Sequence, residues 1–285
     1  MSPLSANTQR QPKGSASRAT AVRSLMTVSF FSLLIAFCGL LGGVLVEGIV
    51  SSFHYDGSLT PWPRCRSCGR HASPLALVPL AGRLLWARRC PACDRPQVRR
   101  ALEVEAVTAA AFFLLSTQYT GYPLQLAIGL VEAALLVAVL FIDVELRLIP
   151  TFLILILSAL GLVSAATLPS LGLTSALEGG AIGFGAFGLL FVAARLVFGP
   201  GAFGLGDAYL AGAIGAITGY PGVVFTLALG VFLGGIGAIL VLLAGAVARG
   251  RRAGLRATIP YGPYLVVGVL YVLARGNTLA PLVHL

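Results

Sequence analysis

Residues 123–142 read PLQLAIGLVEAALLVAVLFI and contain one charged side chain, Glu132. A run of about 20 mostly apolar residues is long enough to cross the hydrocarbon core of a membrane as a single helix. The whole chain has this character, because hydrophobic residues make up 57% and charged residues 11% of its 285 residues. Soluble proteins carry about 25% charged residues. The sequence therefore predicts a polytopic membrane protein rather than a soluble domain.

The predicted fold class is all-α, a membrane helix bundle of about eight transmembrane helices. Their approximate bounds are 26–51, 102–118, 123–142, 149–168, 175–198, 206–220, 222–248 and 260–274. We expect four regions along the chain. These are a disordered tail over residues 1–25, a first transmembrane helix over 26–53, a polar domain over 54–100 and a transmembrane core over 101–285.

The orientation of the bundle follows from its basic residues, which remain in the cytoplasm when they lie in short loops. The loop 54–100 holds nine of them and the loop 249–258 holds four. With eight spans these loops share one side with Arg147 and Arg195, so that 15 of the 20 basic residues lie together. This predicts a cytoplasmic 54–100 loop and both termini outside. Four basic residues in the tail favour the opposite N-terminal placement, which would require one span fewer.

Four of the five cysteines lie in the 54–100 loop as Cys65-Arg-Ser-Cys68 and Cys90-Pro-Ala-Cys93, with 21 residues between the pairs. Two such CxxC turns can direct four thiolates to one tetrahedral Zn²⁺ ion. The sequence therefore predicts a small zinc-knuckle loop with Cys65, Cys68, Cys90 and Cys93 as ligands. Two disulfides are the alternative if the loop faces an oxidising compartment. The fifth cysteine, Cys38, is expected to pack inside the first span.

Two of the ten acidic residues stand at the ends of predicted spans. Asp143 directly follows the predicted span 123–142. Asp207 lies at the start of the predicted span 206–220, at the end of the motif Gly204-Leu-Gly206-Asp207. In the predicted topology both ends face the cytoplasm, so the carboxylates can meet and share a proton as an aspartyl dyad. Gly204 and Gly206 would let an extended substrate backbone approach closely. Alone, this glycine box is also typical of a turn with an acidic helix cap.

These motifs, in this order, resemble those of the prepilin peptidases, the type 4 leader peptidases of bacterial pilus and type II secretion systems. The resemblance covers Pro63 to Ala274 and includes the paired CxxC loop and the Gly204-Leu-Gly206-Asp207 box. It also includes Pro150 seven residues after Asp143, and the stretch Ile259-Pro-Tyr-Gly-Pro-Tyr-Leu before the last span. The chain departs from the family pattern in four places. Tyr209 replaces a common Lys, and Thr151 follows Pro150 where Asp or Asn is usual. The first span has Gly42-Gly-Val-Leu-Val-Glu47 in place of the usual Gly-Ser-Phe-Leu-Asn type of sequence, and no Tyr-Pro precedes Glu105.

The resemblance implies that Asp143 and Asp207 are the catalytic aspartates and that Glu105 falls near the glutamate that opens the second span. It implies a multi-pass peptidase of the bacterial inner membrane that removes the short, basic leader of prepilin or pseudopilin-like proteins. The cut falls between Gly and a hydrophobic residue, often Phe, at the cytoplasmic face. Cysteine-bearing members of the family often also methylate the new N-terminus with S-adenosylmethionine. The expected partners are these precursors and membrane lipid, with no nucleic acid.

Two other readings of the sequence stay open. A presenilin-like intramembrane protease shares the Gly-x-Gly-Asp box, but it pairs that box with a Tyr-Asp motif and a Pro-Ala-Leu box. Here the first aspartate, Asp143, follows Phe141-Ile142 instead of Tyr, and no Pro-Ala-Leu occurs. A non-catalytic scaffold or an ion-coupled transporter with a zinc loop would place acidic residues across the bilayer. Glu132 is the one mid-span acid that supports such a path.

Overall fold

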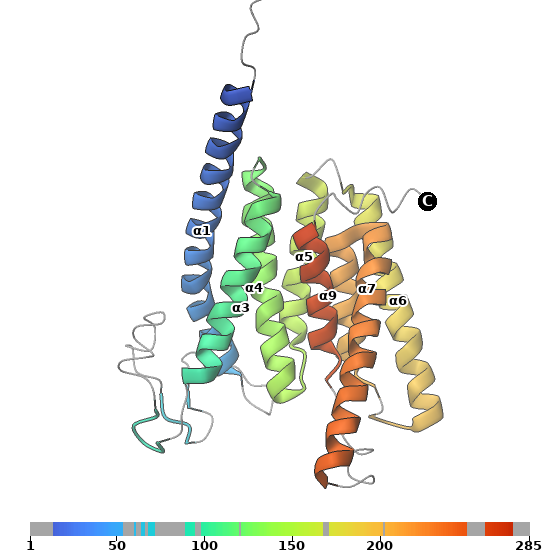
Figure 1. Ribbon diagram of the computed structural model, residues 1–285. Coiled ribbons are helices and arrows are strands. Elements are labelled where there is room, and N and C mark those ends of the chain that lie inside the picture. Colours follow the sequence, from blue (N-terminus) through green and yellow to red (C-terminus); the bar gives the residue numbers. More distant parts are fainter. Residues whose placement is uncertain are drawn as a thin grey trace, which may run out of the picture.

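The computed structural model describes residues 14–53, 60, 64–65, 68–71, 89–94, 98–119, 121–167, 171–201, 203–249 and 260–275. Within these ranges the chain is helical and contains no named strand, and it forms one bundle (Figure 1). The helices are α1 (Gly14–Ser52), α3 (Val98–Gln118), α4 (Pro123–Leu146), α5 (Thr151–Thr167), α6 (Leu173–Phe198), α7 (Leu205–Arg249) and α9 (Gly262–Arg275). The prediction of an all-α membrane bundle is confirmed.

Five of these helices are long and apolar enough to cross a membrane, whereas α5 and α9 are shorter apolar helices. Each predicted span falls within or nearly within a helix. The spans predicted at 206–220 and 222–248 both belong to α7, because the helical segments meet across two non-helical residues, Gly219 and Tyr220. The count of about eight therefore becomes seven helices in the described ranges, one of them broken.

The first helix is longer than predicted, because α1 begins at Gly14 and so includes part of the range 1–25 that we expected to form a disordered tail. Ala and Arg are frequent between Gly14 and the apolar part, and both favour helices. The apolar, potentially spanning part is Phe30–Ser52. Residues 1–13, the rest of that tail, lie outside the described residues.

The break in α7 turns the chain back on itself. Gly179 and Gly183 of α6 lie against Gly215 and Ala211 of α7, which makes the first part of α7 antiparallel to α6. After Gly219 the second part of α7 runs antiparallel to α9: its Gly230 lies against Leu265. The start of α7 and the start of α9 therefore lie at the same end of the bundle.

Helices α1 and α3 pack together at one edge of the bundle, and α6 lies at the opposite edge against α7 (Figure 1). Between them, α4 contacts α1, α3, α5 and α9. The largest buried cluster draws on α4, α5, the first part of α7 and α9, with Leu136, Leu157, Ile214 and Leu265 among its fully buried side chains. The outward faces keep many large apolar side chains exposed, as in Phe37 and Leu196. A bilayer would cover such a surface.

Candidate functional site

Asp143 lies in the last turn of α4, and its side chain is 5% exposed. The helix ends because Arg147 takes a left-handed conformation, with φ 54°, and its backbone N–H donates to the Asp143 carbonyl oxygen over 2.9 Å. The Oδ2 atom of Asp143 is buried and has no hydrogen-bond partner among the described residues. Gly262, at the start of α9, lies directly against this carboxylate, because a Cβ atom there would stand 2.6 Å from Oδ2. A buried carboxylate oxygen left in this way is available to a proton, to water or to a substrate.

Asp207 lies in the first turn of α7, where a negative charge is favoured by the helix dipole, and it is 8% exposed. Its backbone N–H donates to the Gly204 carbonyl oxygen over 3.2 Å. The carboxylate lies back over Gly204, since a Cβ atom at that residue would stand 3.0 Å from Asp207 Oδ2. The Gly204-Leu-Gly206-Asp207 box is therefore a tight turn that directs this aspartate into the end of the bundle.

The two aspartates meet at one end of the bundle. Their charges are close enough to interact, and Gly262, at the start of α9, lies directly against the Asp143 carboxylate. Burial raises the pKa of the neighbouring Tyr261 phenol, and the negative charge of Asp207 adds to this effect. Three segments far apart in the sequence thus converge here: the end of α4, the start of α7 and the start of α9.

Aromatic rings cover this end of the bundle beside Asp207. The Tyr261 ring centroid lies 5.9 Å from that of Phe187, 6.1 Å from that of Phe203 and 6.4 Å from that of Tyr264. Tyr209 stacks on Phe184, with ring centroids 5.7 Å apart. This tyrosine is the residue noted above as departing from the pattern of the prepilin peptidases. The surroundings of the carboxylates are therefore largely apolar.

The four predicted cysteine ligands come together. Their sulfur atoms all lie within 4.8 Å of one another, and the Cys65–Cys93 and Cys68–Cys90 pairs are each separated by 3.6 Å. Tetrahedral zinc with Zn–S bonds near 2.3 Å holds its sulfurs about 3.8 Å apart, so the arrangement fits one zinc ion. No disulfide joins these four cysteines in the structure, which does not match the alternative of two disulfides.

Both cysteine pairs sit on the same kind of turn. Gly69 donates to the Cys65 carbonyl oxygen over 2.7 Å, and Asp94 donates to that of Cys90 over 2.8 Å. Gly69 and Asp94 both have positive φ, 71° and 55°. Because each turn folds over its first cysteine, it can present two sulfurs to the same point.

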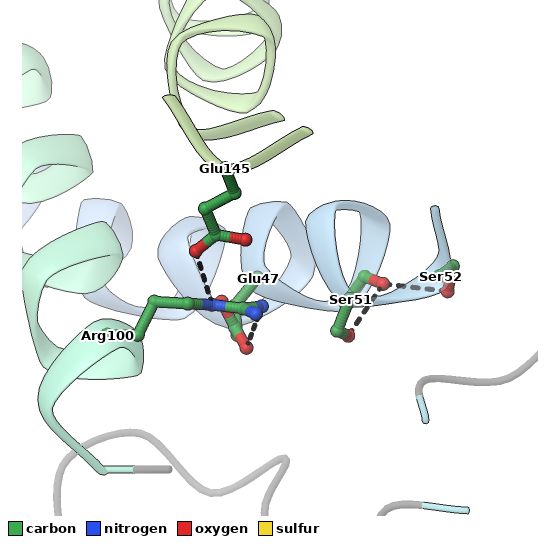
Figure 2. Close-up of polar contacts among 6 residues, drawn as sticks. Glu47, Ser51, Ser52, Arg100 and Glu145 are labelled. Atoms are coloured by element: carbon green, nitrogen blue, oxygen red, sulfur yellow. Dashed lines mark hydrogen bonds and ion pairs between the residues drawn. The ribbon is translucent and has the colours of Figure 1, made fainter. Parts of the chain in front are cut away.

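An ion-pair cluster that the sequence did not predict joins Arg100 to two glutamates (Figure 2). Arg100, in the first turn of α3, donates from Nη2 to Glu47 Oε1 over 2.6 Å and from Nε to Glu47 Oε2 over 3.2 Å. The same Nε lies 3.3 Å from Glu145 Oε1, two residues after Asp143. We call Glu47, Arg100 and Glu145 the Arg100 cluster. It joins α1, α3 and the last turn of α4.

Two further buried acids, Glu132 and Glu105, contact other residues than the two aspartates do. Glu132 is 3% exposed in α4, and its Oε1 has no hydrogen-bond partner in the described part of the chain. It lies near Tyr119, whose phenol pKa is raised by burial and, secondarily, by the charge of Glu132. Glu105 is fully buried in α3 against Gly43 of α1.

Two protein families match the chain. Residues 22–119 match the bacterial peptidase A24 N-terminal domain, and residues 130–239 match the type IV leader peptidase family. The second match contains Asp143 and Asp207, and the first contains all four cysteines of the cluster. No solved structure matches the chain.

Relatives named prepilin leader peptidase/N-methyltransferase are similar over most of the chain. The one from Myxococcus xanthus is 29% identical over 75% of this chain and 64% of its own length. That from Dichelobacter nodosus is 30% identical over 73% of this chain and 69% of its own length. That from Pseudomonas aeruginosa is 29% identical over 76% of this chain and 72% of its own length. With the paired cysteines and the two converging aspartates, these matches show that the chain belongs to the type IV leader peptidase family.

Proposed function

We propose that this chain is a membrane aspartyl endopeptidase that removes the leader peptide of type IV prepilin or pseudopilin-like precursors, with Asp143 and Asp207 as its catalytic pair. The observation that carries the proposal is the convergence of two mostly buried, interacting carboxylates at one end of the bundle. The family matches and the names of the relatives support the same activity.

The chemistry follows from two carboxylates that share one proton, since both cannot ionise cheaply at short range. The ionised carboxylate takes a proton from a water molecule as the water oxygen adds to the peptide carbonyl carbon. The protonated carboxyl donates its proton to the carbonyl oxygen. The C–N bond then breaks as the carboxyl that is now protonated donates its proton to the amide nitrogen. The other carboxylate takes a proton from a hydroxyl group of the intermediate, which becomes the new carboxyl group. The pair thereby returns to its shared-proton state. The unpartnered Oδ2 of Asp143 is available for these transfers.

We propose that the substrate backbone approaches the carboxylates over Gly204, which carries no side chain to obstruct it. At Gly206 the Ile149 side chain occupies the space beside the backbone, 3.0 Å from where a Cβ atom would stand, so the proposal does not extend to this predicted substrate-binding glycine. Gly204 is exposed and borders the Asp207 carboxylate, which supports its part in this role. The apolar surroundings formed by Tyr261 and Phe203 suit a cut that precedes a hydrophobic residue, as the family resemblance implies.

The aspartates and the cysteine loop are proposed to face the cytoplasm from the inner membrane of a bacterium. In the sequence this loop connects the end of α1 to the start of α3, where Arg100 pairs with Glu145, two residues after Asp143. The predicted concentration of basic residues on this side supports the assignment. In this proposal residues 54–100 form a zinc-knuckle domain held by Cys65, Cys68, Cys90 and Cys93, and residues 101–285 form the peptidase core.

A second activity, N-methylation of the new N-terminus, is proposed from the names of the relatives, which are leader peptidases and N-methyltransferases. S-adenosylmethionine is the second substrate of that reaction. It would give its methyl group to the amine that the cut releases.

The proposal is tested by the intact mass of a purified prepilin after incubation with membranes that contain this protein. A product that begins directly after the Gly of the leader is expected from the wild type, and an added methyl mass is expected only with S-adenosylmethionine. Asp143→Asn and Asp207→Asn should each lower the cleavage rate by at least about a thousandfold.

The matched control is Glu103→Gln, which alters an exposed acid paired with Arg99 and should cleave normally. Cleavage retained by either folded aspartate variant would overturn the dyad. A wild type that leaves several prepilins uncut would overturn the peptidase assignment and favour the scaffold or transporter.

A further inference from the structure

Ile149 lies in the short segment between Asp143, at the end of α4, and Pro150, before α5. Its side chain is partly buried and packs against the main core cluster. It carries no chemistry of its own. Its neighbours are nevertheless the two glycines that stand beside the proposed catalytic aspartates.

On one side Ile149 fills the space next to Gly206, which directly precedes Asp207. A Cβ atom at Gly206 would lie 3.0 Å from Ile149 Cβ and 3.5 Å from its Cγ1 and Cδ1 atoms. The α7 backbone at this residue is therefore in contact with the Ile149 side chain, and any shift of that side chain moves the segment that carries Asp207.

On the other side Ile149 reaches Gly262, at the start of α9. A Cβ atom there would lie 3.4 Å from Ile149 Cδ1 and 2.6 Å from Asp143 Oδ2. Gly262 is thus bounded by the same isoleucine and by the carboxylate of the first aspartate. Ile149 thus lies against both glycines, and its segment directly follows α4 in the chain.

We infer that Ile149 is a positioning residue that sets the relative placement of the Asp143 and Asp207 carboxylates, by acting as a spacer between Gly206 and Gly262. The inference rests on the proposed function of the aspartate pair. A β-branched side chain has few rotamers and keeps its shape, so it suits this role. An aspartyl pair depends on a short, oriented contact, and a displacement near 1 Å at a catalytic group costs about a hundredfold in rate.

The central test adds a side chain at Gly206, removes the one at Ile149, and then combines the two substitutions. Gly206→Ala should lower kcat by about a hundredfold with little change in KM, because it pushes Asp207 away without removing a contact to the remote part of the substrate. Ile149→Gly, which removes the whole side chain including Cβ, should lower kcat by about tenfold. The double variant Ile149→Gly with Gly206→Ala should recover at least about tenfold over Gly206→Ala, because glycine removes Ile149 Cβ, the atom that lies 3.0 Å from the added methyl group.

The matched control is Gly212→Ala, on the same helix. A Cβ atom there would stand 3.2 Å from Phe184 Cβ, a similarly tight contact that does not involve Ile149. It should leave kcat unchanged, and combining it with Ile149→Gly should give the kcat of Ile149→Gly alone. Thermal unfolding in detergent checks that the variants compared are folded.

If Gly206→Ala does not fold, Ile149→Val removes only Cδ1 and supplies the second measurement. It should lower kcat by about threefold at unchanged KM. Normal kcat in folded Gly206→Ala or Ile149→Val, or a double variant no more active than Gly206→Ala, would overturn the spacer role. These outcomes are distinct from failure of the proposed function, in which Asp143→Asn or Asp207→Asn itself retains cleavage.

Discussion

Arg100 holds Glu47 through two contacts, Nη2 to Oε1 over 2.6 Å and Nε to Oε2 over 3.2 Å, and so joins the start of α3 to the end of α1 (Figure 2). The side chains of Arg100 and Glu47 are 25% and 10% exposed. Because Glu145 shares the same cation, the last turn of α4 is drawn into this junction. The exit of the cysteine loop is therefore fastened to the helix that carries Asp143.

We predict that Arg100→Gln lowers the free energy of unfolding by about 2 kcal/mol, because it removes the cation from two mostly buried carboxylates. Thermal unfolding of the purified protein in detergent measures the effect. The control is the neighbouring Arg99→Gln: Arg99 pairs with Glu103 at the surface and is 93% exposed, so its loss should change the stability by less than about 0.5 kcal/mol. Equal shifts for the two variants would contradict a structural role for the Arg100 cluster.

The cysteine cluster predicts one bound zinc ion per chain. The sulfur atoms of Cys65 and Cys93, and those of Cys68 and Cys90, are 3.6 Å apart, which matches a tetrahedral thiolate site. Metal analysis of the purified protein should therefore find stoichiometric zinc, and Cys65→Ser and Cys90→Ser should each reduce it to background. Cys38→Ser is the matched control: Cys38 lies in α1, outside the cluster, and its replacement should leave the zinc content unchanged.

A second measurement separates zinc from the disulfide alternative. After denaturation with a chelator and without reductant, all four cluster thiols should react with an alkylating agent. Two disulfides would instead leave the four cysteines unmodified until reductant is added. Zinc retained by folded Cys90→Ser would also contradict the four-ligand site.

Much of the architecture is predictable because apolar runs such as 123–142 have one stable outcome in lipid, the helix that satisfies its own backbone hydrogen bonds. The aspartates were predictable for a similar reason: a carboxylate at the end of a span is costly unless it has a use. The topology then placed Asp143 and Asp207 at one end, and the structure brings them together.

The contacts that organise the site were not predictable in this way. Glu47 and Arg100 are separated by 53 positions, and neither occurs in a motif that would pair them. Ile149 is one apolar residue among many, and its contact with Gly206 depends on how α4, α5 and α7 pack. Such contacts are decided by tertiary packing, which the spacing of residues along the chain does not report.

Glu132 distinguishes the peptidase from an ion-coupled transporter. It is 3% exposed, and its Oε1 has no hydrogen-bond partner in the ranges the structure describes. A transport path would require an acid that gains and loses a proton at this depth. The proposed peptidase does not, so Glu132→Gln should keep the cleavage rate within about twofold of the wild type.

The measurement is the cleavage rate of the same prepilin, alongside a folding check by thermal unfolding. Glu132→Asp is a useful companion, because it keeps the charge and shortens the side chain. A folded Glu132→Gln that no longer cleaves, with Glu132→Asp active, would show that the carboxyl group itself is needed and would contradict the prediction.

The break in α7 depends on Gly219, so a side chain at this position should lower the stability of the protein. Its φ of 63° and ψ of −180° belong to a region that side chains avoid. A Cβ atom there would also stand 2.5 Å from Ser175 Oγ and 2.7 Å from Leu171 Cδ1. Ser175 Oγ donates to the Tyr220 carbonyl oxygen over 2.8 Å, so the added methyl group would press on the contact that joins this turn to α6.

Gly219→Ala should therefore lower the free energy of unfolding by about 1–3 kcal/mol. The matched control is Gly188→Ala in α6, where a Cβ atom meets nothing within 4 Å, and which should be neutral or stabilising. Because Gly219 lies at the opposite end of the first part of α7 from Asp207, the folded fraction of Gly219→Ala should cleave with unchanged KM. A stability equal to that of the wild type would mean that the turn tolerates a side chain, and that the reversal of α7 does not depend on the glycine.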